Sequence, residues 1–263
     1  MKIARFKWKG EIVYGTIEGD EIFTVSGNIF EEIKVGNKLC KVEEVRFLTP
    51  VEPQTIVGVG SNYEETYDRL RETFTNIQLP KPEERKRPRF FIKTLSSVIG
   101  HLDYVVYPTI SKEVYTSPEP VAVIKKTAKY VSESEANNYV LGYTCGNDLY
   151  ALDLQKEDEL RTGRAHNCDT FTSFGPIISL GLSWDNLKIV SRVNGKVVKE
   201  GNTRHMVFSA SRIISDLSQF MTLKPGDIIF LGTIGGTLIN VGDILEVDIE
   251  GIGILKNEVI APK

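Results

Sequence analysis

The stretch GYTCGNDLYALDLQ, from Gly142 to Gln155, is the most informative part of the chain. Its β-branched and aromatic beginning is typical of a strand, and it predicts a turn through Gly146 and Asn147. Asp148 and Asp153 follow that turn. A strand that delivers a carboxylate into a turn is one way to build a site for a hard cation. Asn-Asp is also the chemistry of a turn or a helix cap, and spacing alone favours the cap.

Composition limits the class of protein. The 263 residues suffice for one domain or for a small and a large one, and 25% charged with 41% hydrophobic residues is ordinary for a soluble globular protein. A net charge of −3 gives no electrostatic footprint for nucleic acid or for a membrane surface. Three widely spaced cysteines argue against a disulfide framework or a zinc knuckle. No apolar run resembles a signal peptide or a membrane span, so we expect a cytoplasmic protein.

The order of strand and helix patterns predicts a mostly β protein. Residues 1–48 contain short alternating segments separated by glycines, which predicts antiparallel hairpins. A helix is expected over 64–74, with Ser61 or Asn62 as its cap. Pro118 and Pro120 predict that the apolar run after them forms an edge strand or an irregular one.

Beyond this local chemistry, GYTCGND-x-x-A-x-D-x-Q resembles the central motif of the fumarylacetoacetate hydrolase family. The run from Gly201 to Thr237, with the following VGDILEVDIEGIGILKN, resembles the same family almost position for position. The similarity extends from about Pro50 to the end of the chain and includes the 2-hydroxyhepta-2,4-diene-1,7-dioate isomerase and 5-carboxymethyl-2-oxo-hex-3-ene-1,7-dioate decarboxylase members. It implies an α+β, mostly β fold: a mixed β-sandwich roll over 50–263, preceded by a small N-terminal β-domain over 1–49.

The resemblance also implies a divalent cation, Mg²⁺ or Mn²⁺, held by carboxylates. The family's metal strand reads E-x-E-L-A-V-V-I, and matching its apolar end to this chain places the two glutamates at Ser117 and Glu119. Together with Asp148, these are the implied metal ligands. Because serine cannot supply a carboxylate, the metal should bind weakly or be absent.

Other positions of the family pattern carry the implied contacts with substrate. His166 and Thr233 are the implied catalytic residues, and Gln155, Lys93 and Tyr63 the implied substrate-binding residues. Each also has an ordinary structural interpretation, such as a strand-edge lysine for Lys93 or a tight turn for Thr233.

Two departures from the family pattern bear on the activity. Thr66 replaces the family's basic histidine, and threonine has no useful basicity near neutral pH. Glu65 and Glu72 are candidate replacements, although solvated helix charges are the simpler interpretation of both. Leu152 replaces the arginine that would bind a substrate carboxylate.

The resulting hypothesis is a divergent, metal-dependent hydrolase, isomerase or lyase. Its partner would be a small 2-oxo or enol acid, as in the catabolism of aromatic compounds, and its chemistry C–C hydrolysis, decarboxylation or keto–enol isomerisation through a stabilised enolate. The alternative is a family member that has lost catalysis and serves as a binding or structural protein. Under either hypothesis we expect a homodimer.

Overall fold

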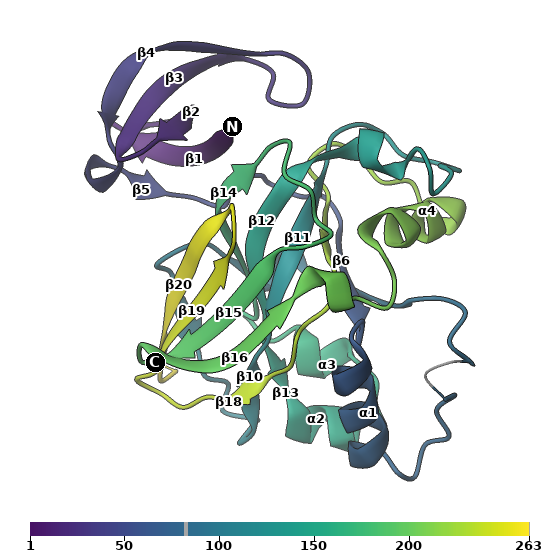
Figure 1. The fold of residues 1–263 in the computed structure, drawn as a ribbon. Helices are drawn as coiled ribbons and strands as arrows, with labels where there is room; N and C mark the ends of the chain where they lie inside the picture. Colours follow the sequence, from purple (N-terminus) through teal and green to yellow (C-terminus); the bar gives the residue numbers. More distant parts are fainter. Residues whose placement is uncertain (82–83, 263) are drawn as a thin grey trace.

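The computed structural model describes residues 1–81 and 84–262 and is mostly β-strand (Figure 1). Its strands form a twelve-stranded, a five-stranded and a three-stranded sheet. The first contains β1 (Lys2–Trp8), β2 (Glu11–Glu18), β3 (Glu21–Gly27), β4 (Ile33–Lys41), β5 (Arg46–Phe47), β6 (Ile56–Gly60), β7 (Arg89–Lys93), β8 (Val98–Ile99), β11 (Pro118–Ile124), β12 (Val140–Asp148), β14 (Thr172–Ser179) and β17 (Ile228–Phe230).

The other two sheets and the helices complete the fold, and these elements confirm the expected α+β, mostly β class. The five-stranded sheet contains β9 (Tyr104–Val106), β15 (Lys188–Val193), β16 (Lys196–Asn202), β19 (Ile244–Ile249) and β20 (Gly253–Ile260), and the three-stranded sheet contains β10 (Val114–Thr116), β13 (Tyr150–Ala151) and β18 (Thr237–Leu238). The α-helices of the described residues are α1 (Glu64–Thr73), α2 (Leu152–Glu157), α3 (Gly163–His166) and α4 (Ala210–Phe220), with short 3-10 turns η1 (Val42–Glu44), η3 (Leu95–Ser97), η4 (Ala136–Tyr139) and η5 (Thr203–His205).

The first four strands form an antiparallel meander at the N-terminus, as the glycine-punctuated alternation predicts. Strand β1 also pairs with β14, so the meander continues the large sheet (Figure 1). A division of the chain near Pro50 into a small and a large domain stays a prediction.

Strand β11 lies inside the large sheet, between β12 and β17, so the prediction of an edge strand is wrong. The alternative, an irregular strand, agrees with the register shift between Val123 and Ile124 in its pairing with β12. The carbonyl of Ser117 accepts from Asp148 N on the β12 side, whereas the carbonyl of Pro120 accepts from Leu231 N on the β17 side. Backbone groups alternate sides along a strand, so both prolines turn their missing N–H toward β17. Because both prolines face away from β12, the β12 ladder loses no donor. Pairing with β17 begins only at Val121, after both prolines.

The largest cluster of buried apolar side chains lies between the large sheet and the five-stranded sheet. Alternate residues of β11 serve the two faces of its sheet: Ala122 and Ile124 belong to the cluster shared with β15, β19 and α4, and Val121 and Val123 to a cluster under the N-terminal strands. Helix α4 packs its apolar face on the first cluster, and its N-cap is Ser209, whose hydroxyl accepts from Arg212 N at 3.0 Å.

Two local predictions around the site fail. The chain does not turn at Gly146 and Asn147, because β12 runs through both to Asp148. The Asn147 side chain instead accepts from Ser117 N at 2.7 Å. Neither predicted residue caps α1: its N-cap is Tyr63, and the Asn62 amide holds the backbone of the segments around Phe208 and Leu231.

Candidate active site

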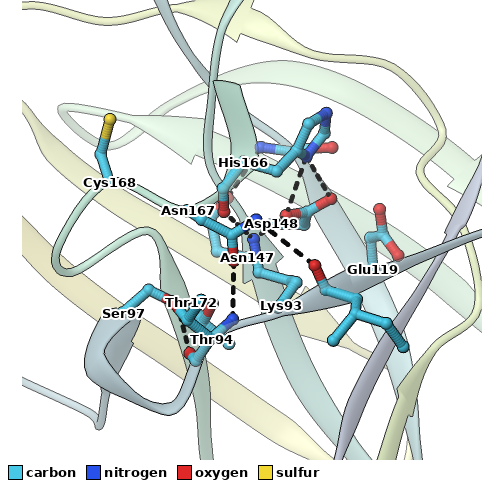
Figure 2. Close-up of polar contacts among 12 residues, drawn as sticks. Lys93, Thr94, Ser97, Glu119, Asn147, Asp148, His166, Asn167, Cys168 and Thr172 are labelled. Carbon is cyan, nitrogen blue, oxygen red and sulfur yellow. Dashed lines mark hydrogen bonds and ion pairs between the residues drawn. The ribbon is translucent and has the colours of Figure 1, made fainter. Parts of the chain in front are cut away.

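A buried polar cluster lies at the end of β12 and joins three segments far apart in sequence (Figure 2). The Lys93 ammonium, from the end of β7, donates to Asp148 Oδ1 and to the carbonyl of His166, the latter at 2.6 Å. His166 Nδ1, from α3, lies 3.0 Å from Asp148 Oδ2. All three side chains are nearly inaccessible to solvent. Asp148 is therefore held from two directions, by a cation and by an imidazole.

These partners keep Asp148 ionised despite its burial. Burial alone would raise the pKa of the Asp148 carboxyl, but the positive charges and hydrogen bonds of Lys93 and His166 lower that pKa below its usual value. An ionised Asp148 can accept a hydrogen bond from the Nδ1–H of His166, and in the neutral imidazole this tautomer has Nε2 as the acceptor nitrogen.

Glu119 provides a second buried carboxylate beside Asp148 (Figure 2). Its Oε2 accepts from Gly232 N at 2.8 Å. Gly232 has φ +106°, and a Cβ there would overlap Asn62, so glycine is needed at this position. Burial raises the pKa of Glu119 well above its usual value and the charge of Asp148 raises it further, while the Gly232 N–H and Lys93 act in the opposite direction. Ionised Glu119 would thus be stabilised by a cation.

Aromatic side chains fix the orientation of the His166 ring. Tyr150 stacks on it at 5.4 Å between ring centroids and 15° between planes, and Phe91 packs against it at 4.6 Å. Tyr115 in turn stacks on Tyr150 at 5.3 Å. Burial raises the pKa of Tyr150, so its phenol stays protonated. The imidazole is held by packing as well as by Asp148.

A cavity of about 400 Å³ gives access to this cluster. Most of the site residues expected from sequence line it: Ser117, Glu119, Asp148, Gln155, His166 and Thr233. Thr233 Oγ1 accepts from Gly235 N at 3.1 Å, so its own proton can be donated into the cavity. Thr66 and Leu152, which replace the histidine and arginine of the family pattern, also line the wall.

Two residues expected to bind substrate take other positions. Lys93 lies behind Asp148 and is absent from the described cavity lining, so its contacts are those of a group that positions Asp148. Tyr63 is buried beside a second cavity, and its hydroxyl has no hydrogen-bond partner among the described residues.

Sequence reasoning overlooked Arg69, Arg89 and Tyr150, all of which line the cavity. A signal for Arg69 is present in the helix periodicity. Thr66, Arg69 and Thr73 repeat at i, i+3 and i+7 along α1, so one face of the helix carries all three toward the cavity. Arg89 and Tyr150 carry no comparable signal.

The donor atoms fit a hard cation, though with few charged ligands. Glu119 and Asp148 offer two carboxylates at the cavity and Ser117 adds a hydroxyl, and oxygen ligands of this kind suit Mg²⁺ or Mn²⁺. Among the described residues, Glu119 accepts one hydrogen bond, from Gly232 N, and burial together with the charge of Asp148 raises its pKa. In the described part of the chain, no three His, Cys, Asp or Glu side chains are grouped as a metal site.

The fold agrees with comparisons to known proteins. The family model described as fumarylacetoacetate (FAA) hydrolase C-terminal matches residues 55–260, and one described as Rv2993c-like, N-terminal matches residues 1–50. The chain belongs to the fumarylacetoacetate hydrolase family.

Relatives and solved structures give the context within the family. The chain is 39% identical over 259 residues to a protein of Archaeoglobus fulgidus whose function is not assigned (98% of this chain, 96% of the other). It is 37% identical over 233 residues to human mitochondrial oxaloacetate tautomerase FAHD2A (82% and 70%). The crystal structure of 2-hydroxyhepta-2,4-diene-1,7-dioate isomerase from Mycobacterium marinum superposes with TM-score 0.87 at 29% identity (99% and 98%).

A more distant structure shares the fold alone. Maleylpyruvate hydrolase from Sphingobium sp. SYK-6, in complex with manganese(II) and pyruvate, superposes with TM-score 0.79 at 24% identity, covering all of both chains. As to membranes, every helix within residues 1–81 and 84–262 is too short or too polar to span a bilayer.

Proposed function

We propose that this protein is a keto–enol isomerase of small 2-oxo acids. The observation that carries the proposal is the His166 ring, which is held by Asp148 at Nδ1 and is part of the cavity lining. A fixed imidazole next to a water-accessible cavity is suited to moving a proton on and off a substrate carbon. The names of the human relative and of the Mycobacterium marinum structure, a tautomerase and an isomerase, favour the same reaction class.

The residues suggest how the proton moves. Nε2 of His166 takes the proton from the carbon next to the keto group, and the C–H electron pair becomes the C=C bond of the enolate. The former carbonyl π pair moves to oxygen, where the Thr233 hydroxyl can donate a hydrogen bond to it. His166 then returns its proton to that oxygen, which gives the enol, and the reverse order gives the ketone. Asp148 stabilises the imidazolium between the two transfers.

A divalent cation, where bound, would be held by Glu119, Asp148 and Ser117. The chemistry it supplies is stabilisation of negative charge on an enolate. Two carboxylates in place of three should make its binding weak.

Hydrolysis of a C–C bond is less well supported. That reaction needs a group that activates water in addition to one that stabilises the enolate. Thr66 lies in the cavity at the position where the family pattern has its basic histidine, and it cannot serve as a base. A proton shift requires only one base, which His166 provides.

The proposal is tested by following the conversion of enolic oxaloacetate to its ketone by the loss of its ultraviolet absorbance. We expect His166→Asn to lower the catalysed rate by roughly 10²- to 10⁴-fold, the range for loss of a general base. His205→Gln is the matched control, since His205 is exposed on η5 and outside this cavity. A wild-type protein that binds the acid without accelerating its conversion would favour the non-catalytic binding protein.

We also propose that the protein is a homodimer. Large apolar side chains are exposed on the five-stranded sheet and the turn beside it, among them Tyr104, Ile244 and Ile254. A second copy that covers them would remove apolar surface from water. Light scattering at micromolar concentration should give about twice the 29.5 kDa of one chain, and a monomer mass would contradict the proposal.

A further inference from the structure

Two arginines line the active-site cavity without a carboxylate partner. Arg69, on α1, and Arg89, at the start of β7, form no ion pair with any Asp or Glu of the described residues. The acidic part of the same cavity contains Glu119 and Asp148. One cavity therefore contains both carboxylates, with Asp148 in contact with His166, and two guanidinium groups that have no carboxylate partner among the described residues.

Arg69 is directed at the site through its contact with the glycine-rich turn after β17. Its Nη1 donates to the carbonyl of Gly236 at 3.4 Å, a long bond that satisfies one of five guanidinium N–H groups. Arg69 is also close enough to Tyr150 to act on it electrostatically, and Tyr150 stacks on His166. The guanidinium thus lies beside the aromatic wall that orients the proposed base.

Arg89 is partly buried next to this region. Burial lowers the pKa of its guanidinium, although arginine stays charged in proteins. A charge that has lost part of its hydration and has no protein counter-ion gains more from an anionic ligand than an exposed one does. The phenyl ring of Phe91, two residues further along β7, packs on His166, so β7 links Arg89 to the site.

Leu152 bears on the role of these two arginines, because it lines the same cavity. In the family pattern this position carries the arginine that binds a substrate carboxylate, and here it is an aliphatic side chain on the cavity wall. We infer that Arg69, together with Arg89, binds a second carboxylate of the substrate, and that the site selects 2-oxo dicarboxylic acids over 2-oxo monoacids. This inference rests on the proposed function, because it places the 2-oxo group of the substrate beside His166.

Binding measurements on matched ligands test the inference independently of catalysis. The ligands are the 2-oxo diacids of four to seven carbons, each paired with the methyl ester of its distal carboxylate, and affinity is measured by calorimetry. The ester keeps the carbon chain of the diacid, removes the distal charge and adds one methyl group. We expect wild type to bind at least one diacid roughly 10- to 100-fold more tightly than its ester, the range for hydrogen bonds to charged groups.

Variants assign that preference to the arginines. Arg69→Gln and Arg89→Gln should each reduce the diacid-to-ester ratio toward one while leaving the affinity for the ester and the melting temperature unchanged. Arg71→Gln is the matched control: Arg71 is two residues away on α1, pairs with Asp68 at 4.0 Å and is absent from the described cavity lining.

The outcomes separate this inference from the proposed function. A wild-type ratio near one, or a ratio unaffected by both cavity variants, overturns the inference even where the protein isomerises oxaloacetate. Diacid preference that depends on Arg69, without any isomerisation, overturns the proposed function and leaves the carboxylate site standing. Binding of neither ligand of any pair overturns both.

Discussion

Lys93 and Asp148 are 55 residues apart in sequence and form an ion pair in which both side chains are almost completely buried, with exposed fractions of 0% and 3%. The pair joins the end of β7 to the end of β12. Because Asp148 also holds His166, the ion pair fixes the charge of the residue on which the proposed base depends.

Removing the cation should destabilise the fold strongly. Lys93→Met leaves a buried carboxylate with only the His166 ring as a partner, and loss of one member of a buried ion pair costs about 3–5 kcal/mol. Lys156→Met is the matched control, since Lys156 forms an exposed pair with Glu113 at 2.9 Å and should change stability by less than about 1 kcal/mol. Urea unfolding measures both, and equal effects would contradict the importance of burial.

Gly146 in the central motif should tolerate no side chain. A Cβ there would lie 2.6 Å from Phe230 Cε1 and would also overlap Val121, both in the neighbouring core. We expect Gly146→Ala to lower the free energy of unfolding by about 1–3 kcal/mol, as overpacking does. Gly163→Ala on α3, with open space around the added atom, should be neutral or stabilising. If Gly146→Ala were neutral, Gly146 would be packed less closely against Val121 and Phe230 than the structure shows.

Glu119 should make stability fall as pH rises in metal-free buffer. Its pKa is raised on folding, so over the interval between the unfolded and folded pKa values the folded chain retains a proton that the unfolded chain has released. The stability from protonated Glu119 is complete below the unfolded pKa and is lost as pH rises through the folded one. Glu119→Gln removes this loss while keeping an acceptor for Gly232 N.

The melting temperature of Glu119→Gln relative to wild type should therefore be higher at pH 8 than at pH 4 in the presence of EDTA. The pH profile distinguishes titration from packing, because a packing change would shift both temperatures by a similar amount. A constant difference between the two proteins across this range would contradict the raised pKa of Glu119.

Divalent cations should offset the loss of stability that occurs when buried Glu119 ionises. Millimolar MgCl₂ or MnCl₂ is expected to raise the wild-type melting temperature at pH 7, since a ligand that binds only the folded chain stabilises it. Glu119→Gln should lose this shift, while Glu65→Gln, an exposed residue of α1, should retain it. A shift that persists in Glu119→Gln would mean that the ion binds elsewhere.

The sequence predicted the parts of the fold that depend on local patterns. Alternating residues separated by glycines predicted the N-terminal hairpins. Prediction from the sequence failed where contacts between distant segments determine the local structure. Pro118 and Pro120 suit an interior strand only because pairing with β17 starts after them, which no local rule contains. The strand through Gly146 continues because β11 and β14 flank it on both sides.

The site was predictable to a similar extent. Family positions located Glu119, Asp148 and His166 near one another, and the structure brings them to one cavity. Their roles stay predictions. The burial of Lys93 behind Asp148 could not be read from the sequence, because it depends on β7 and β12 ending at the same place. Arg69 was within reach, as it shares a helical face with Thr66.

The most direct test of His166 as the proton-transferring group is the exchange of substrate hydrogen in D₂O. Proton NMR follows the loss of the C3 hydrogens of a 2-oxo acid with wild type, His166→Asn and the control His205→Gln. We predict rapid exchange with wild type and with the control, and a rate lower by roughly 10²- to 10⁴-fold with His166→Asn. Exchange at the wild-type rate with His166→Asn, or no catalysed exchange with wild type, would contradict the account.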